Sequence, residues 1–363
     1  MPNDGIGENL DMIKTLLDLD SQSGDNDQNV DDKFGFSYDT TVSIPYDNNR
    51  IVFGAPGTGK SFNLQRDFEE VKKIYAGAEV ERVTFHPDYT YAQFVGTYKP
   101  VMDENGEKIK YEFIPGPFMR VLTKALLNAK TNSHKPYILI IEEINRARVA
   151  SVFGDIFQLL DRNNKGISEY AIQTSEDIRR YLAPIFSVAK DDIDTIRIPN
   201  NMFIWSTMTS ADQGVFSMDT AFKRRWNFEY LGINDGEKKI EGIAKFNVAN
   251  SSELIEWNKL RKAINMKMSS TDFRVNEDKL MGPFFISMKL LESDDNGVLI
   301  DEKRFIQAFK SKVLMYLYED AIKQRKHDFF ENCDTSRYSE ICDAFDKKGL
   351  DIFGSSFLHD FYE

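Results

Sequence analysis

A glycine-rich segment near residue 55 has the composition and spacing of a phosphate-binding loop. The sequence Gly54-Ala55-Pro56-Gly57-Thr58-Gly59-Lys60-Ser61 matches the pattern G-x-x-x-x-G-K-[ST] and directly follows the apolar run Ile51-Val52-Phe53. Glycines allow the backbone to form a nest of N–H groups, and a helix that begins near Lys60 would add the positive end of its dipole. We therefore expect residues 54–62, including Phe62, to bind a nucleotide, with Lys60 on the β- and γ-phosphates and the Ser61 hydroxyl on Mg²⁺.

Two carboxylates end the next strongly apolar segment. The run Tyr137-Ile138-Leu139-Ile140-Ile141 predicts a buried strand, and Glu142 and Glu143 follow it. In a nucleotide-hydrolysing site, Glu142 would hold the hydrated Mg²⁺ and Glu143 would orient the water that attacks the γ-phosphate. Taken alone, the pair fits a solvated acidic turn equally well. Its position downstream of a phosphate loop favours the catalytic interpretation.

Polar residues and two arginines follow a third strand-like segment. The stretch Phe203–Met208 precedes Thr209, which stands where a sensor of the γ-phosphate is expected. Farther on, Arg224 and Arg225 stand together before another predicted strand. In ring-forming nucleotide hydrolases such arginines reach the γ-phosphate of the neighbouring subunit, which would build the active site between subunits. The alternative is that these arginines only make a helix end soluble.

The elements that must position these residues alternate along the chain. Short apolar runs predict strands, and helical patterns lie between them. Such alternation is typical of an α/β fold in which a mostly parallel sheet has helices on both faces. A turn signal within residues 99–115 also predicts a β-hairpin insertion, and residues 163–194 look like a second insertion. The expected strands are 50–53, 81–85, 137–141, 202–208 and 227–231.

These patterns divide the chain into three parts. Residues 1–47 are polar and acidic, and predict a short helix around Met12 on a flexible tether. Residues 48–235 carry the alternating pattern and form the expected nucleotide-binding core. Residues 236–363 are dominated by helical periodicity, which predicts a helical C-terminal lid subdomain.

Composition limits the remaining possibilities. The chain has 363 residues, of which 41% are hydrophobic, as expected for a soluble globular protein. The apolar run near residue 140 is far shorter than the roughly 20 residues of a membrane span, and no signal segment opens the chain, so we expect a cytoplasmic protein with no membrane contact. A net charge of −12 argues against a broad DNA-binding surface on this chain alone. Cys333 and Cys342 are expected to be ordinary thiols, and no metal other than nucleotide-bound Mg²⁺ is indicated.

Together, the motifs resemble the McrB family of AAA+ proteins, the nucleotide-hydrolysing subunits of modification-dependent restriction systems. The resemblance runs from about Arg50 to Phe285. It rests on the phosphate loop, on Glu-Glu-Ile-Asn-Arg at 142–146 for the family's D/E-E-I-N-R, and on Met-Thr-Ser-Ala-Asp-Gln-Gly at 208–214 for its M-N-T-A-D-R-S. Residues 277–285 add a smaller similarity.

The resemblance implies a role for each matching side chain. Asn145 and Thr209 would sense the γ-phosphate, and Asp212 would order the neighbouring loop. Three residues depart from the family's pattern, since Glu142 replaces Asp, Thr209 replaces Asn and Gln213 replaces Arg. Because Gln213 carries no charge, the candidates for the arginine that acts on a neighbouring subunit are Arg146, Arg224 and Arg225.

The resemblance also implies a P-loop AAA+ core and a Mg²⁺-dependent hydrolase of ATP or GTP. Such a protein would form a homo-oligomeric ring, with a hexamer as the expected form, and would act on DNA through a complex with an McrC-like or other nuclease subunit. Only a short segment precedes the core and no nuclease motif stands out, so we expect DNA reading and cleavage to belong to partners. Two alternatives stay open: a protein-remodelling ATPase similar to the MoxR or dynein-related group, and a nucleotide-bound scaffold with weak catalysis.

Overall fold

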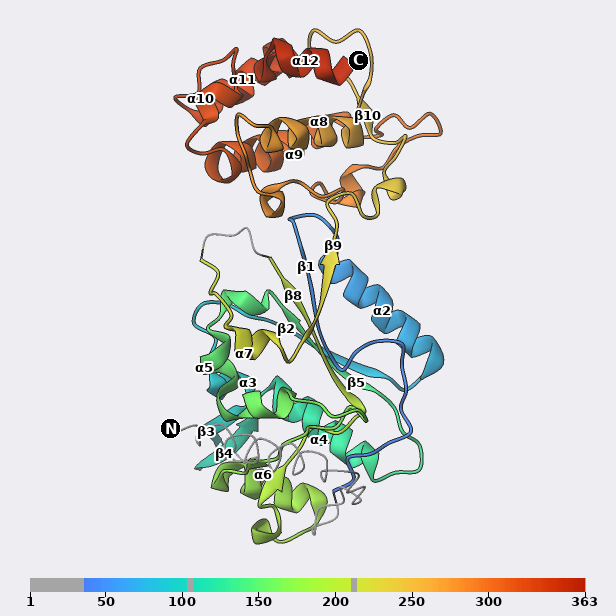
Figure 1. Ribbon diagram of the computed structural model, residues 1–363, viewed down its shortest axis with the longest axis vertical. Coiled ribbons are helices and arrows are strands. Elements are labelled where there is room, and N and C mark those ends of the chain that lie inside the picture. Colours follow the sequence, from blue (N-terminus) through green and yellow to red (C-terminus); the bar gives the residue numbers. More distant parts are fainter. Residues whose placement is uncertain (1–35, 103–107, 210–213, 363) are drawn as a thin grey trace, which may run out of the picture.

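The computed structural model describes residues 36–102, 108–209 and 214–362 (Figure 1). A five-stranded parallel sheet in the order β2-β5-β8-β1-β9 organises the first part of the chain. The α/β fold class with a parallel sheet flanked by helices is therefore confirmed. The strands are β1 (Asn49–Gly54), β2 (Glu79–Thr84), β5 (Tyr137–Glu142), β8 (Met202–Met208) and β9 (Asn227–Leu231).

Burial explains why three of these strands are almost continuously apolar. Strands β5, β8 and β1 lie inside the sheet, where both faces are covered, whereas β2 at the edge alternates partly buried and exposed residues. Val52 and Ile138 pack with α2 on one face, and Ile51 and Leu139 pack with α4 on the other. The helices of this part are α2 (Lys60–Ile74), α3 (Tyr91–Phe94), α4 (Pro117–Ala129), α5 (Val149–Phe153), α6 (Glu176–Phe186) and α7 (Thr220–Lys223).

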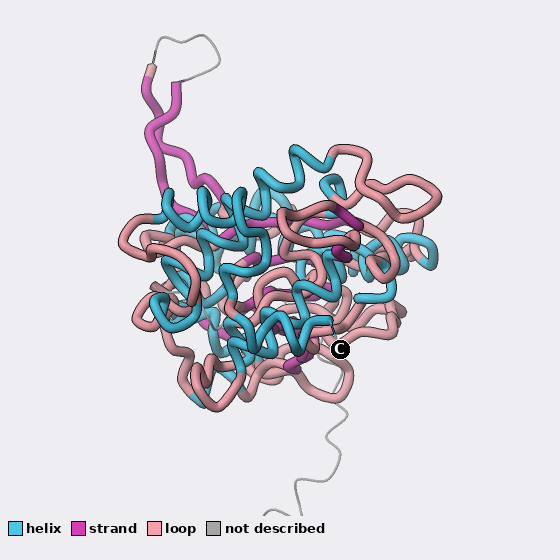
Figure 2. The backbone as a smooth tube through the Cα atoms, turned by 90° about the horizontal axis from the view of Figure 1, so that it is seen from above, coloured by secondary structure: helices cyan, strands magenta, loops and turns pink. Residues whose placement is uncertain are grey.

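Two insertions leave the sheet, as the sequence predicts. Strands β3 (Gly96–Met102) and β4 (Ile109–Pro115) form an antiparallel hairpin that projects from the body of the molecule (Figure 2). The second insertion, between β5 and β8, contains α6 and a small antiparallel pair, β6 (Ile172–Gln173) with β7 (Thr195–Ile196).

The remainder of the chain builds a second hydrophobic core from residues between Ile240 and Phe357. Helix α9 (Glu302–Ala308) continues into wider π-helical turns at Phe309–Leu314 and Leu317–Ala321. A short pair, β10 (Lys245–Phe246) with β11 (Ile255–Glu256), precedes the main helix. The other helices are α8 (Trp257–Ser269), α10 (Lys326–Phe329), α11 (Tyr338–Lys348) and α12 (Ser355–Tyr362).

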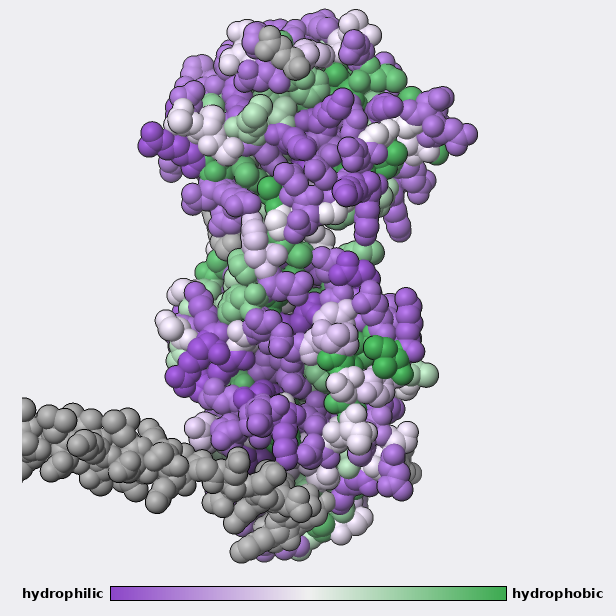
Figure 3. Space-filling view, turned by 45° about the vertical axis from the view of Figure 1, so that its right-hand side comes forward, coloured by the Kyte–Doolittle hydropathy of each residue, from purple (hydrophilic) through white to green (hydrophobic). Residues whose placement is uncertain are grey.

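The two parts meet at a waist that is visible on the molecular surface, whose exposed face is largely hydrophilic (Figure 3). The division of the chain into parts that end at residues 47 and 235 is a proposal. The helix expected around Met12 lies outside the described residues. Within the described ranges, every helix is too short or too polar to cross a membrane. Short 3-10 turns occur at Ile144–Arg146, Gly154–Leu160, Lys190–Asp192, Glu237–Lys239, Glu277–Lys279, Met288–Leu290 and Gly349–Phe353.

Candidate nucleotide-binding site

The phosphate loop joins the end of β1 to the start of α2. Gly57 and Gly59 have positive φ angles of 79° and 89°, a backbone conformation that glycine adopts without steric cost. The Thr58 hydroxyl donates a hydrogen bond to Ala55 O at 2.9 Å and closes the loop on itself. Gly59 caps the 15-residue helix α2, so the unpaired N–H groups of the first helical turn face the loop.

A cavity of about 350 Å³ opens in front of this loop. It combines residues from the loop, from the ends of β5 and β8, and from the C-terminal part of the chain. Most of the residues that the sequence assigns to phosphate binding line this cavity, whereas Gly54, Ala55 and Thr58 lie behind it. The lining residues are Pro56, Gly57, Gly59, Lys60, Ser61, Phe62, Glu143, Thr209 and Phe284.

Lys60 folds over the loop that it follows. Its ammonium group donates hydrogen bonds to Gly54 O at 2.9 Å and to Ala55 O at 3.1 Å, and the residue is only 8% exposed. Because Lys60 also lines the cavity, its charge lies beside the place that a bound phosphate would occupy.

Glu142 gathers three partners at the end of β5. One of its carboxylate oxygens, Oε2, accepts hydrogen bonds from the Ser61 hydroxyl at 2.8 Å and from the Thr207 hydroxyl at 2.6 Å. The other oxygen pairs with the Arg82 guanidinium. The carboxylate of Glu142 and the hydroxyl of Ser61 are therefore adjacent, at the position where the sequence predicts Mg²⁺.

These oxygen donors fit Mg²⁺, which binds through one or two carboxylate or hydroxyl groups and keeps water or substrate phosphates as its remaining ligands. In the described ranges, no group of three or more His, Cys, Asp or Glu side chains could hold a metal. A phosphate oxygen and water would have to complete the coordination shell here.

Glu143 has an unusual backbone conformation. Its φ of 55° and ψ of 51° lie in the left-handed region of backbone conformation. Residues other than glycine rarely adopt this conformation, and those that do are often found at functional sites. The bend is held because the Glu143 N–H donates to the Thr207 hydroxyl at 3.0 Å. Oε1 of Glu143 accepts from the Thr209 hydroxyl at 3.1 Å, and Oε2 lies 3.6 Å from Arg146 Nε. The carboxylate is thereby aimed at the cavity.

Asn145 supports this arrangement from behind. Its side chain is buried, and Nδ2 donates to Thr209 O at 2.9 Å, which fixes the backbone at the end of β8. Asn145 is not among the residues that line the cavity. Asp212 and Gln213, which the sequence analysis singles out, lie outside the described residues.

Arg224 and Arg225 lie at the end of the parallel strands opposite the phosphate loop. They precede β9, whose first residue, Asn227, pairs with Arg50, whereas the phosphate loop begins level with Leu231 at the other end. This strand separates the two ends by about 13 Å. Neither arginine is therefore placed near the phosphate loop of its own chain, whereas Arg146 is.

The two neighbouring arginines differ in their surroundings. Arg225 has a side chain only 8% exposed, forms an ion pair with Asp161 at 2.6 Å and lies over the Phe157 ring at 4.0 Å. Arg224 is exposed, and its guanidinium has neither a hydrogen bond nor an ion pair within the described residues.

Three residues of the site have no role in the sequence interpretation. Thr207 bonds to both carboxylate residues, Arg82 pairs with Glu142, and Phe284 closes the cavity from the C-terminal part. A polar residue near the end of an otherwise apolar strand is a signal for Thr207. Arg82 has no comparable signal, and Phe284 is marked only by its place in the segment 277–285 that resembles the family. The contacts of both depend on which strands and segments become neighbours in space.

Comparisons with known proteins agree with this geometry. The family model for the AAA domain (dynein-related subfamily) matches residues 49–226. Component YdiS of the type II restriction enzyme BsuMI from Bacillus subtilis is 43% identical over 345 residues, which cover 88% of this chain and 92% of YdiS. The EcoKMcrB subunit of the type IV methyl-directed restriction enzyme of Escherichia coli is 29% identical over 180 residues, which are 50% of this chain but only 34% of that protein.

The match to the AAA domain spans the phosphate loop, Glu142 at the end of β5 with the adjoining Glu143, and strand β8, which Thr209 follows. The similarity to YdiS extends over nearly all of both chains. This chain belongs to the McrB-like AAA+ nucleotide hydrolases that are subunits of restriction systems.

Proposed function

We propose that this chain hydrolyses ATP or GTP with Mg²⁺ in the cavity beside the phosphate loop, and that it is the ring-forming motor or regulatory subunit of a DNA restriction system. The observation that carries the catalytic part is the bend at Glu143. This bend points a carboxylate into the same cavity as Lys60 and Ser61. Binding alone needs the loop, whereas hydrolysis needs a group that orients water.

The phosphates bind to the loop N–H groups and to Lys60. Lys60 exchanges its two loop carbonyl partners for phosphate oxygens, which retains its hydrogen bonds and adds a charge pair. Ser61 and Glu142 would hold Mg²⁺, which would neutralise phosphate charge when bound.

Glu143 orients the attacking water. The water oxygen bonds to the γ-phosphorus and the water gives up one proton, which is released to the solvent. The bond from that phosphorus to the β,γ-bridging oxygen breaks, and the products are the nucleoside diphosphate and inorganic phosphate. Thr209 keeps the Glu143 carboxylate in place through its hydroxyl, and Asn145 keeps Thr209 in place through its amide. Asp212 would order the adjoining loop.

Arg224 is the arginine that we assign to the neighbouring subunit's γ-phosphate. Its exposure and its place at the far edge of the sheet support a contact between subunits, whereas Arg225 is engaged by Asp161 within its own chain. A homo-oligomeric ring, with a hexamer as the expected form, supplies one such contact for every site.

The partner in this proposal is an McrC-like or other nuclease subunit, through which the ring acts on DNA. Support comes from the two relatives, each of which is a component or subunit of a restriction enzyme. The net charge of −12 favours contact with DNA through such a complex over binding by this chain alone.

Steady-state phosphate release from ATP and from GTP, in Mg²⁺ and at several protein concentrations, tests the proposal. We expect a specific activity that rises with protein concentration for one nucleotide and is lost in Lys60→Ala. Glu143→Gln should bind that nucleotide with an affinity close to that of the wild type but turn it over about 100-fold or more slowly. Turnover by Glu143→Gln at the wild-type rate would refute the assignment of Glu143.

A further inference from the structure

A short segment of the C-terminal part lies directly on the phosphate loop. We call residues Met281–Phe285 the strap. Gly282 N donates a hydrogen bond to Pro56 O at 2.8 Å, and Phe284 N donates to Gly57 O at 2.8 Å. The strap therefore binds the same loop residues that must keep their shape for phosphate binding.

This contact is possible only because glycines face each other across it. A Cβ atom added to Gly282 would lie 2.4 Å from the carbonyl carbon of Gly57, and one added to Gly57 would lie 2.4 Å from Phe285 N. Both distances are below 3.0 Å, which real Cβ atoms essentially never show, and the opposing atoms are backbone. The strap and the loop thus touch through their main chains.

Two side chains of α8 hold the strap from the other side. Asn265 forms a two-point contact with Met281, since Nδ2 donates to Met281 O at 2.8 Å and Oδ1 accepts from Met281 N at 2.9 Å. Arg261, one turn earlier, donates from Nη1 to Met281 O at 2.9 Å. Paired bonds of this kind fix position and direction together.

Arg261 also holds the linker that leaves the sheet after β9, residues 232–237. It donates to Asn234 Oδ1 at 2.9 Å and to Ile233 O at 3.3 Å, and it forms an ion pair with Glu237 at 3.3 Å. The linker and strap meet a second time, because a Cβ at Gly236 would lie 3.2 Å from the Phe284 ring. One buried guanidinium therefore ties the strap to the linker.

Burying the Arg261 guanidinium costs desolvation free energy. It is fully buried, and burial lowers its pKa to about 10 while the charge of Glu237 opposes that shift. The guanidinium stays protonated at neutral pH. A buried charge of this kind is retained only where its hydrogen bonds are nearly all satisfied, and it then permits few arrangements of its partners.

We propose that Arg261 and Asn265 are positioning residues for the hydrolysis reaction: they hold the strap on the phosphate loop and thereby couple docking of the strap to nucleotide binding in that loop. The inference rests on the proposed function, since the nucleotide is what changes the loop. Coupling is reciprocal, so a docked strap strengthens nucleotide binding as much as a bound nucleotide strengthens docking.

Hydrogen exchange of the strap measures this docking without an activity assay. The Gly282 and Phe284 amides bond to the loop, so mass spectrometry of peptides that cover 280–286 reports the contact. We expect ADP or GDP with Mg²⁺ to slow this exchange in the wild type. Asn265→Ala should speed it about tenfold or more, because both bonds to Met281 are lost.

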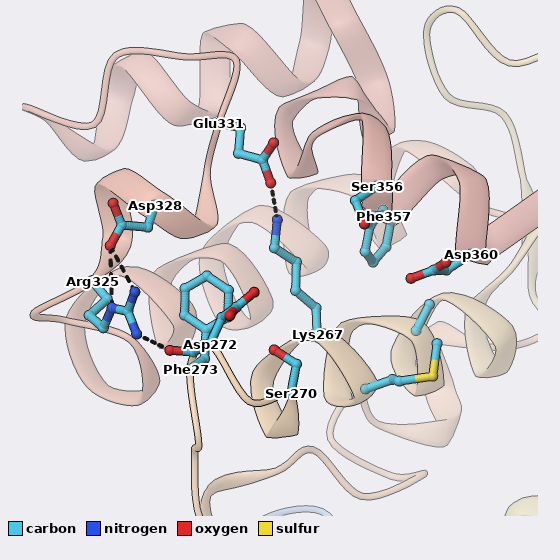
Figure 4. Close-up of a pocket in the computed structure, with 12 residues that line it drawn as sticks. Lys267, Ser270, Asp272, Phe273, Arg325, Asp328, Glu331, Ser356, Phe357 and Asp360 are labelled. Atoms are coloured by element: carbon cyan, nitrogen blue, oxygen red, sulfur yellow. Dashed lines mark hydrogen bonds and ion pairs between the residues drawn. The ribbon is translucent and has the colours of Figure 1, made fainter.

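Lys267→Met is the matched control. Lys267 lies on the same helix and is also largely buried, but it points into a separate cavity of about 290 Å³ (Figure 4). There it bonds to Glu331 at 2.7 Å and to Phe353 O at 2.5 Å. Exchange of the strap in Lys267→Met should equal that of the wild type.

A second variant changes a residue of the strap itself and leaves Arg261 and Asn265 intact. Gly282→Ala should push the strap off the loop, weaken nucleotide binding about tenfold and lower kcat/KM by at least the same factor. Gly77→Ala is its control, since an added Cβ there meets only the flexible side chain of Lys135.

Three outcomes decide between the alternatives. Faster strap exchange together with weaker binding in both Asn265→Ala and Gly282→Ala, with normal controls, supports the coupling. Wild-type exchange and wild-type kcat/KM in these two variants would overturn it and leave the proposed function standing. A wild type that neither binds nor hydrolyses a nucleotide would reject the proposed function and the coupling with it, and the failure of the wild-type sample itself identifies that case.

Discussion

One hydroxyl group connects the two carboxylates of the site. Thr207 donates its proton to Glu142 Oε2 at 2.6 Å and accepts the Glu143 N–H at 3.0 Å, so it uses its donor and an acceptor at once. The first bond orients the expected Mg²⁺ ligand. The second holds the left-handed bend that aims Glu143 at the cavity. Thr207 is not among the residues that line the cavity, but the positions of both carboxylate residues depend on it.

Thr207→Val should therefore damage catalysis more than folding. Valine keeps the shape of threonine but leaves the Glu143 N–H without its partner, which costs about 1–3 kcal/mol. We expect kcat to fall roughly 10- to 100-fold, because the orientation of Glu143 is lost. Thr207→Ser keeps the hydroxyl and should retain most of the turnover. Equal kcat values for the valine and serine variants would show that the hydroxyl is not needed.

At the scale of elements, a buried ion pair joins the strand and the helix on either side of the phosphate loop. Arg50 of β1 and Asp67 of α2 lie 2.5 Å apart, with side chains only 3% and 4% exposed. The Arg50 guanidinium also lies 4.8 Å from the centres of the Tyr46 and Trp205 rings. Strand, helix and the neighbouring strand β8 are thus held at one point. This contact therefore fixes the distance between β1 and α2 that the phosphate loop has to bridge.

Asp67→Asn should destabilise the fold strongly, since it removes the buried carboxylate partner of Arg50 and leaves only the half-exposed Glu229, 3.3 Å away, to pair with that charge. Removing one partner of such a pair typically costs about 3–5 kcal/mol, whereas replacing both partners with apolar residues is much less harmful. Chemical denaturation should show this loss for Asp67→Asn and a clear recovery in Arg50→Met/Asp67→Leu. A single variant within about 0.5 kcal/mol of the wild type would show that the pair does not stabilise the fold.

The elements also show what could be predicted from the sequence. Strands β1, β5 and β8 are predictable because strands buried on both faces are continuous apolar runs, and each ends at a polar motif. The contact of the strap with the phosphate loop could not be predicted, because it is made by backbone groups of segments far apart in the chain. Arg261 is equally hidden, since a basic residue in a polar helical pattern is normally exposed, whereas this one is buried against Met281.

At the scale of the whole molecule, the two halves of the proposed active site lie at opposite ends of the parallel strands. The phosphate loop and Glu143 lie where the parallel strands end, and Arg224 lies where β9 begins. If Arg224 is the catalytic arginine, as we propose, a single chain does not complete its own site. A head-to-tail assembly, in which the edge with Arg224 meets the neighbour's loop, completes every site when it closes into a ring.

Mixing two inactive variants tests this arrangement directly. Glu143→Gln damages the loop side of a subunit, and Arg224→Gln damages the opposite side. In a randomly mixed ring, about one quarter of the contacts join an intact Glu143 to an intact Arg224, so phosphate release should recover toward a quarter of the wild-type rate. Glu143→Gln mixed with Lys60→Ala is the control. Because both of these changes lie on the loop side, no contact in that mixture contains an intact site, and we expect no recovery. Recovery in neither mixture, although sedimentation shows mixed rings, would place the catalytic arginine elsewhere, with Arg146 of the same chain as the next residue to test. Recovery in the control mixture would show that Glu143 and Lys60 do not act in the same site.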